Sequence, residues 1–192
     1  MDHTIFRWIN NLTEHTTWAN GVVKFYAQAG IAVFAALLVV AFLDARHHDD
    51  RIALATTIWA GAAALAALGI GQLIGQAADR ARPYETLSNV HLVVSKTTDF
   101  SFPSDHATVA GAVAAGLVIA NRRWGTIAAV AALMMTFARV YVGAHYPGDV
   151  LAGLALGVLV AIAGRYLVVP VLRRLLDRLA TTPARRLLTA SR

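Results

Sequence analysis

Residues 60–75 read AGAAALAALGIGQLIG, and Gln72 is the only polar side chain in this run. Alanine and glycine let helices approach one another closely in lipid, where packing replaces the hydrophobic effect as the force between helices. The run lies within the apolar segment 52–76, which is long enough for a helix to cross a bilayer, since that takes roughly 20 residues. We therefore expect a membrane-spanning helix that packs tightly against its neighbours.

The whole chain has the composition of a membrane protein. Hydrophobic residues make up 57% of its 192 residues and charged residues only 15%, and the mean hydropathy is +0.56. A soluble domain of this size needs more polar surface. Four further apolar segments can span a bilayer, at 25–43, 104–121, 125–143 and 149–171. We expect an all-α fold, a polytopic membrane helix bundle of five to six transmembrane helices, with a single membrane-embedded domain over residues 1–172.

The first twenty residues are less apolar than the segments that follow. Apolar side chains recur there at helical spacing, at Ile5, Phe6, Trp8, Ile9 and Leu12. This pattern predicts an amphipathic helix over about residues 2–20 that lies in the membrane interface. The alternative is a sixth, poorly hydrophobic helix that spans the membrane or re-enters it.

Arginine residues set the expected orientation. Arg46 and Arg51 lie in the first loop, Arg122 and Arg123 lie in the third, and a basic tail, residues 173–192, follows the last apolar segment. With five spans these regions share one side, which the positive-inside rule assigns to the cytoplasm together with the C-terminus. The formal charge of +6 does not indicate nucleic-acid binding, because no aromatic-rich polar platform accompanies it.

Loops 77–103 and 144–148 then face the outside together, and they hold most of the unusual polar residues. Three stretches stand out: DRARPYE at 79–85, FPSDH at 102–106 and ARVYVGAHYPGD at 138–149. Charged groups at helix ends in an apolar protein are costly unless they are paired or used. We therefore expect a functional site on the outer face.

Two features of these stretches fit the binding of phosphate. Ser104 and Asp105 stand where a helix would begin, and the unpaired N–H groups of a helix N-terminus favour anions. Arg82 and Arg139 carry planar, permanently charged forks that match phosphate oxygens in pairs. The alternatives are simple capping by Ser104, and for Arg82 either snorkelling to the interface or an ion pair with an acidic neighbour in the DRARPYE stretch.

The histidines suggest a nucleophile and an acid. His145 and Asp149 are four residues apart, so a helix that begins near Tyr146 would bring them to one face. A carboxylate beside an imidazole fixes its tautomer and raises its basicity, which leaves the other nitrogen free to attack phosphorus. His106, at another helix start, could protonate the leaving oxygen and then activate water. For His145 and Asp149, a purely structural ion pair is the alternative.

At these residues the sequence resembles the type 2 phosphatidic acid phosphatase superfamily. The motifs of that family are Lys–six residues–Arg–Pro, Pro–Ser–Gly–His, and Ser–Arg–five residues–His–three residues–Asp. Arg82–Pro83 matches the end of the first motif, and residues 103–106 match the second with Asp in place of Gly. Residues 138–149 match the third, with Ala138 in place of Ser. The resemblance covers about residues 50–170.

The resemblance implies an enzyme that works through a phosphohistidine with no required metal or cofactor. It also implies roles for individual residues: phosphate binding for Arg82, Ser104 and Arg139, proton donation for His106, and the nucleophile pair for His145 and Asp149. The run His47–Asp50 could look like a metal site, but it lies in the opposite loop, where we expect a solvated turn. The chain has no cysteine, so disulfides and thiolate chemistry are excluded.

The sequence also departs from the family pattern. The lysine of the first motif would fall at Gly75. We expect Arg80 or Lys96 to replace it in holding phosphate, with Gln72 and Gln76 as the alternatives. Asp105 adds negative charge beside the expected phosphate site, where it contacts the substrate or orients a neighbour.

The stretch SFPSDHAT at 101–108, together with IFRWIN at 5–10, resembles the bacitracin-resistance-type undecaprenyl diphosphate phosphatases. That resemblance implies a polyprenyl diphosphate, undecaprenyl or decaprenyl, as the substrate at the outer leaflet of the bacterial plasma membrane. The product would be the monophosphate carrier used in cell-wall peptidoglycan synthesis.

Three alternatives to this substrate and class stay open. The enzyme could act on phosphatidylglycerophosphate, phosphatidic acid or another prenyl phosphate, because all of these present a terminal phosphate. A transporter is disfavoured, because transporters place polar groups near the bilayer midplane rather than at one interface. An inactive lipid-binding scaffold is disfavoured by the presence of both histidines and Asp149. The sequence makes no prediction of oligomeric state.

Overall fold

The computed structural model describes residues 1–182, which form helices and no strand. The helices are α1 Asp2–Asn10, α2 Leu12–His15, α3 Thr17–Ala29, α4 Ile31–His47, α5 Arg51–Ala78, α6 Pro83–Thr86, α7 Asp105–Ala120, α8 Arg122–Tyr141, α9 Pro147–Leu167 and α10 Val169–Leu179. The expected start of the basic tail at residue 173 falls inside α10. Three of the tail's arginines lie outside the described residues: Arg185, Arg186 and Arg192.

Each predicted apolar segment coincides with a helix or a pair of helices. Three helices, α5, α8 and α9, are long and apolar enough to cross a membrane. A fourth span is possible if α3 and α4, which meet at a bend of 59°, cross together. The segment predicted at 104–121 is α7, a shorter apolar helix of 16 residues. The prediction of an all-α membrane helix bundle is confirmed, and three or four of the described helices qualify as spans by length and composition.

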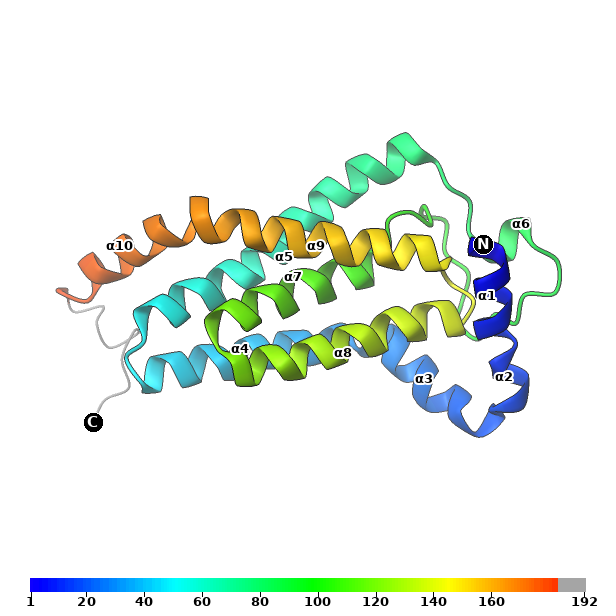
Figure 1. Ribbon diagram of the computed structural model, residues 1–192, viewed down its shortest axis with the longest axis horizontal. Helices are drawn as coiled ribbons and strands as arrows, with labels where there is room; N and C mark the ends of the chain where they lie inside the picture. The colour runs from blue at the N-terminus through cyan, green and yellow to red at the C-terminus, as the bar shows by residue number, and fades with distance from the viewer. Residues whose placement is uncertain (183–192) are drawn as a thin grey trace.

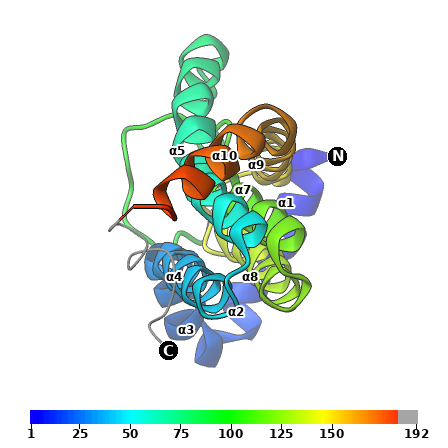
Figure 2. The ribbon, with the colours of Figure 1, turned by 90° about the vertical axis from the view of Figure 1, so that its left-hand side faces the viewer.

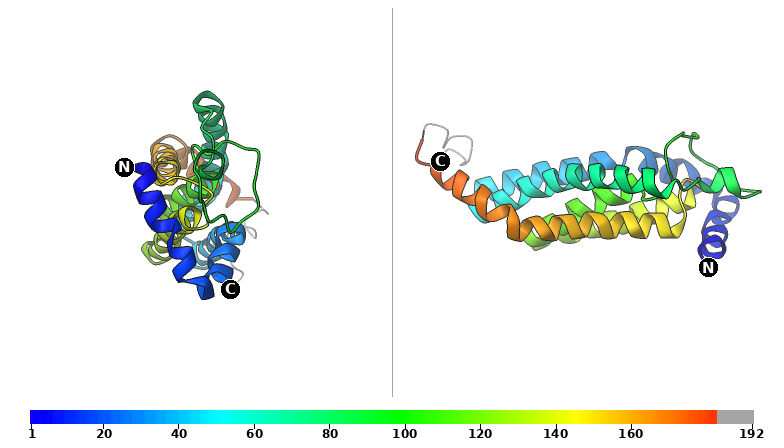
Figure 3. Two further views of the ribbon diagram at one scale, coloured as in Figure 1. Left: turned by 90° about the vertical axis from the view of Figure 1, so that its right-hand side faces the viewer. Right: turned by 90° about the horizontal axis from the view of Figure 1, so that it is seen from above.

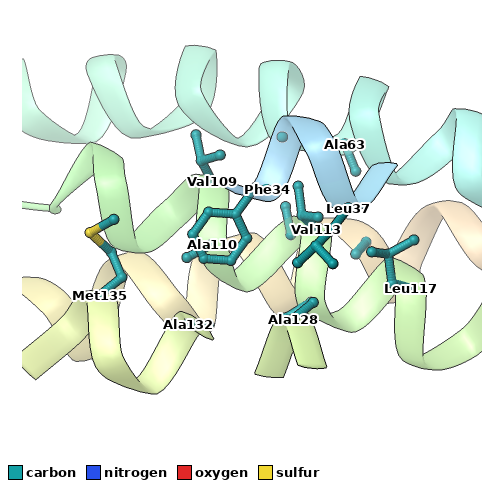
Figure 4. Packing of buried hydrophobic residues seen from close by; sticks show 14 of the residues in the cluster. Phe34, Leu37, Ala63, Val109, Ala110, Val113, Leu117, Ala128, Ala132 and Met135 are labelled. Carbon is teal, nitrogen blue, oxygen red and sulfur yellow. The ribbon is translucent and has the colours of Figure 1, made fainter. Parts of the chain in front are cut away.

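Helix α7 lies in the centre of the bundle, in contact with α4, α5, α8 and α9 (Figure 2). In the core, Val113 and Leu117 of α7 pack with Phe34 and Leu37 of α4 and with Met135 of α8 (Figure 4). Neighbouring helices rather than lipid therefore surround most of α7. This position brings its first residues to a protein-lined site.

Glycine is required where α7 and α9 meet. A Cβ added to Gly157 would collide with the backbone of Thr108 and Ala112 on α7. We expect Gly157→Val to force the helices apart and to lower the melting temperature in detergent by about 5 °C or more. Gly69→Val is the matched control, because nothing lies within 4 Å of a Cβ at that position on α5. Equal melting temperatures of the two variants would contradict this packing.

The N-terminal segment is broken where we expected one helix over residues 2–20. It forms α1 and α2 and then begins α3, with breaks at Asn11 and Thr16. Asn10 turns the chain toward the bundle, because its buried side chain donates hydrogen bonds to the carbonyls of His91 and Tyr141, at 2.9 and 2.8 Å. Helix α1 runs across the end of the bundle rather than along it (Figure 3).

Helix α1 keeps the predicted amphipathic character. Phe6 is buried against the bundle, whereas Trp8 is 72% exposed. Nine residues are too few to cross a bilayer. The first helix is therefore a cap on one end of the bundle and not a sixth span.

The two ends of the bundle differ. Helices α1 and α6 lie at one end, and α10 and the turn between α4 and α5 lie at the other (Figure 1). In that turn, Asp50 caps α5 by accepting hydrogen bonds from the N–H groups of Ile52 and Ala53. Arg51 pairs with Asp177 of α10 at 3.1 Å. The run His47–Asp50 is thus an exposed turn, at the end remote from α1.

Candidate active site

The ends of α3, α7 and α8 and the loop after α6 surround a pocket of about 270 Å³. Five predicted site residues line it: Arg82, Asp105, His106, Arg139 and His145. The other lining residues are Gln28, Tyr84, Val94, Ser95, Thr97, Asp99, Phe100 and Ala144. The three polar stretches that the sequence singled out therefore converge on one cavity.

His145 lies between α8 and α9 with only 2% of its surface exposed. Its Nε2 lies 3.1 Å from Nη1 of Arg82 and 3.2 Å from Nη2 of Arg139. A guanidinium only donates hydrogen bonds, so Nε2 is the unprotonated acceptor. Nδ1 then carries the proton and donates it to the carbonyl of Ser101 at 2.8 Å.

Burial, together with the charges of the two arginines, holds the pKa of His145 well below its usual value of 6.5. The ring is therefore neutral at pH 7, and its Nε2 lone pair points at the cationic wall of the pocket. A neutral imidazole in this state is a competent nucleophile.

Asp149 does not pair with His145 as directly as we expected. Its Oδ2 lies 3.9 Å from Nδ1 of His145, and the nearer partner of Nδ1 is the Ser101 carbonyl. The physical reason is the start of α9: Asp149 is the third residue of that helix, so its carboxylate turns back to accept the N–H of Tyr146 at 2.9 Å. The same oxygen accepts the Ser101 hydroxyl at 2.5 Å. Asp149 thus acts on His145 through Ser101.

Arg82 is almost fully buried, and it makes several hydrogen bonds to backbone carbonyls. Its Nε, Nη1 and Nη2 donate to the carbonyls of Asp99, Ala144 and Phe100 at 3.1, 2.9 and 3.3 Å. Its ion pair is with the Asp99 carboxylate at 3.0 Å. Glu85, an acidic neighbour, instead accepts the backbone N–H of Arg82. These contacts fix the guanidinium at the wall of the pocket.

Two buried donors in this region have no partner among residues 1–182. One is Nε of Arg139, whose Nη1 donates to the carbonyl of Ala27 at 3.0 Å. The other is the hydroxyl of Ser104, which makes no capping hydrogen bond although Ser104 stands at the N-cap of α7. Buried unsatisfied donors are costly. Arg139 therefore keeps one N–H without a protein acceptor among the described residues. Ser104 does not line the pocket, and capping does not account for its hydroxyl.

His106 and Asp105 begin α7 and line the pocket. Gln28, near the end of α3, lines the same pocket as His106. Asp105 accepts two hydrogen bonds from Nε2 of Gln72 on α5, at 3.1 and 2.9 Å. The orienting role that we allowed for Asp105 has a partner in Gln72. The other expected role of Asp105, direct contact with the phosphate of the substrate, stays a prediction.

The expected replacements for the missing lysine, Arg80 and Lys96, are absent from the residues that line the pocket, and their binding of phosphate stays a prediction. The guanidinium nitrogens Nη2 and Nη1 of Arg80 form ion pairs with the carboxylates of Asp2 and Asp149, each at 2.6 Å. Lys96 lies with its Nζ 5.6 Å from the ring centroid of Tyr84. At Gly75 an added Cβ would lie 3.0 Å from the carbonyl of Phe102, because the loop packs directly on this glycine. The two permanent cations that line the pocket are therefore Arg82 and Arg139.

Three contributors to the site escaped the sequence analysis. Ser101 accepts a hydrogen bond from His145 through its carbonyl and donates one to Asp149 through its hydroxyl, and Gln28 lines the pocket. Asp99 contacts Arg82 from the loop. Only Ser101 carried a signal, because it directly precedes the FPSDH stretch.

Comparison with known proteins identifies the family of this chain. Residues 56–173 match the sequence profile of the PAP2 superfamily. The undecaprenyl-diphosphatase BcrC of Bacillus subtilis is 30% identical over 160 residues, which cover 83% of this chain and 80% of that protein.

Two crystal structures share the fold. LpxE of Aquifex aeolicus superposes with a TM-score of 0.65 at 22% identity, covering 84% of this chain and 93% of that one. A PAP2-type phosphatidylglycerolphosphate phosphatase of Bacillus subtilis gives a TM-score of 0.59 at 21% identity, covering 84% and 83%. At these identities the two structures are evidence for the fold alone.

Proposed function

Because this chain belongs to the PAP2 superfamily, we propose that it removes the terminal phosphate of a polyprenyl diphosphate, undecaprenyl or decaprenyl, through a phosphohistidine at His145. Membership makes the chain a membrane-embedded phosphatase that acts on lipid phosphates. The observation that supports the mechanism best is the setting of His145. One ring nitrogen is held by a carbonyl, and the other faces two guanidinium groups.

In the first step, Nε2 of His145 attacks the terminal phosphorus. A nitrogen–phosphorus bond forms, and the bond from phosphorus to the bridging oxygen breaks. The leaving monophosphate takes a proton from the protonated form of His106, which becomes neutral, and the Nδ1 proton of His145 stays shared with the Ser101 carbonyl. In the second step, neutral His106 takes a proton from water, which attacks phosphorus and releases inorganic phosphate from Nε2.

Arg82 and Arg139 stabilise the charge that spreads over the phosphoryl oxygens. In the free protein their N–H groups point at Nε2 of His145. An entering phosphate offers them oxygens instead, which frees the lone pair for attack. Phosphoryl transfer depends on such positioning and charge neutralisation more than on covalent help. The N-terminus of α7, whose first residues line the pocket, supplies further donors in this proposal, and phosphate binding by the unpartnered Ser104 hydroxyl stays a prediction because Ser104 itself does not line the pocket.

The choice of substrate rests on the relative that covers most of the chain, whose name is undecaprenyl-diphosphatase. The arginines in the turns at the end remote from the site support an orientation with the C-terminus in the cytoplasm. The pocket would then open on the outer face of a bacterial plasma membrane. The monophosphate product would return to cell-wall synthesis.

A side-by-side assay tests this function. Purified protein in detergent is given an undecaprenyl diphosphate, phosphatidylglycerophosphate or phosphatidic acid, with EDTA present, and inorganic phosphate is measured. We expect release from the diphosphate at a kcat/KM at least about tenfold above that of either glycerolipid, a discrimination of about 1.4 kcal/mol. A preference for a glycerolipid would overturn the substrate, and loss of release in EDTA would contradict a metal-free reaction.

A further inference from the structure

Asp2, at the first position of α1, lies in direct contact with a network that leads to the nucleophile. We propose that Asp2 and Arg80 are positioning residues, which hold Asp149 and Ser101 so that Ser101 fixes the His145 ring for attack. This inference rests on the proposed function for its kinetic consequence. Neither residue stands at a fixed position of the three motifs, and neither lines the pocket.

The first part of the network joins α1 to the start of α9. Oδ2 of Asp2 accepts from Nη2 of Arg80 at 2.6 Å, and Oδ1 accepts from the backbone N–H of Gly148 at 2.9 Å. The other arm of Arg80 donates to Oδ1 of Asp149 at 2.6 Å. One guanidinium therefore bridges two carboxylates, from α1 and from α9.

The second part of the network reaches His145. Asp149 is completely buried, and its Oδ2 accepts the Ser101 hydroxyl at 2.5 Å. The Ser101 N–H donates to the backbone carbonyl of Arg80 at 2.9 Å. Arg80 thus holds Ser101 twice, once through its own carbonyl and once through Asp149. The Ser101 carbonyl then accepts from Nδ1 of His145 at 2.8 Å.

Asp2 holds the arm of Arg80 that Asp149 does not hold. The side chain of Arg80 is 30% exposed, so water competes for its N–H groups. Its Cζ lies 4.3 Å from the ring centroid of Tyr146, and that ring is in turn packed by His3 and Phe6 of α1. Burial alone would raise the pKa of Asp2, but the hydrogen bonds from Arg80 and Gly148 outweigh it and lower that pKa. Asp2 is therefore an anion at pH 7.

Removing the charge of Asp2 leaves Arg80 with one carboxylate. We expect Asp2→Asn to lower kcat by about 10- to 100-fold, because small displacements of a reacting group have effects of this size. KM should change by less than about twofold, since Arg82 and Arg139, which hold phosphate in the proposed function, meet His145 but make no hydrogen bond to Asp2, Arg80, Asp149 or Ser101. Asp2→Glu keeps the charge and should recover part of the lost kcat.

Glu14→Gln is the matched control on the same N-terminal segment, since Glu14 pairs with His91 at 3.3 Å and does not contact Arg80. It should keep the wild-type kcat. The second readout is hydrogen exchange at the Ser101 amide, which should be faster by about tenfold in Asp2→Asn and unchanged in Glu14→Gln. This measurement needs no substrate.

The outcomes separate the two proposals. A wild-type protein that releases no phosphate from any lipid overturns the proposed function, and the exchange rates then decide alone whether Asp2 holds Ser101. A wild-type kcat in Asp2→Asn, or equal losses in Asp2→Asn and Glu14→Gln, would overturn the positioning role. Unchanged exchange at Ser101 would overturn it as well.

Discussion

Replacing His145 by alanine is expected to bring phosphate release to background, a loss of about 10⁴-fold or more. No other described side chain presents an unprotonated ring nitrogen to both Arg82 and Arg139. Without Nε2 no covalent intermediate can form, and water must attack phosphorus directly. The measurement is inorganic phosphate released from the preferred lipid, with the melting temperature recorded beside it.

His91→Ala is the control for this variant, because His91 lies at the same end of the bundle and pairs with Glu14 rather than with the pocket. It should keep wild-type activity. A brief reaction with substrate labelled in its terminal phosphate should leave acid-labile label on the wild type and on His91→Ala, and none on His145→Ala. Undiminished release by His145→Ala would contradict the mechanism.

The residues that the sequence predicted well are those tied to regular structure. His106 stands at a helix start and Arg139 near a helix end, so their motifs and the apolar period around them were enough to bring both to one end of the bundle. The five apolar segments were visible for the same reason. Helical periodicity is local, and it does not depend on contacts between distant parts of the chain.

The residues that the sequence missed act through the backbone or across long separations. Ser101 holds His145 through its backbone carbonyl, a group that every residue has, so this contact leaves little signal in the sequence. Arg80 meets Asp2 across 78 residues, and this contact depends on α1 crossing the end of the bundle. That crossing follows from the break after Asn10, which a helical pattern could not predict.

The pairing of Asp149 with His145 shows the limit of a spacing rule. Four residues along a helix do bring two side chains to one face. Here, however, the helix begins after His145, and the cap of α9 takes the carboxylate. Nδ1 of His145 lies 2.8 Å from the Ser101 carbonyl and 3.9 Å from the Asp149 carboxylate. The position of the loop that contains Ser101, and not the spacing of His145 and Asp149, therefore determines which of them accepts the hydrogen bond.

Arg139→Met is expected to lower kcat/KM by about 10³-fold or more, the size of effect that a transition-state arginine has in phosphoryl transfer. Arg139→Lys keeps the charge but loses the planar fork, which contacts the Ala27 carbonyl with one arm and His145 with the other. We expect it to lose about 10²-fold. Arg123→Met, at the remote end of α8, is the matched control and should keep wild-type activity.

Arg139 also leads to a prediction about stability, which can be tested without measuring activity. Arg139 is 8% exposed, its Nε has no partner, and no carboxylate in residues 1–182 lies within ion-pair distance of it. Burying such a charge without an opposing one costs stability. We therefore expect Arg139→Met to melt at the same temperature as the wild type or at a higher one, even as activity is lost.

With an anion in the pocket, we expect the wild type to melt at a higher temperature than Arg139→Met. Vanadate or inorganic phosphate supplies the missing partner and should raise the melting temperature of the wild type, because a ligand that binds only the folded state stabilises it. The rise should be absent in Arg139→Met and retained in Arg123→Met. A variant that lost activity but still gained stability from vanadate would show that Arg139 serves the transition state without holding the ground-state phosphate.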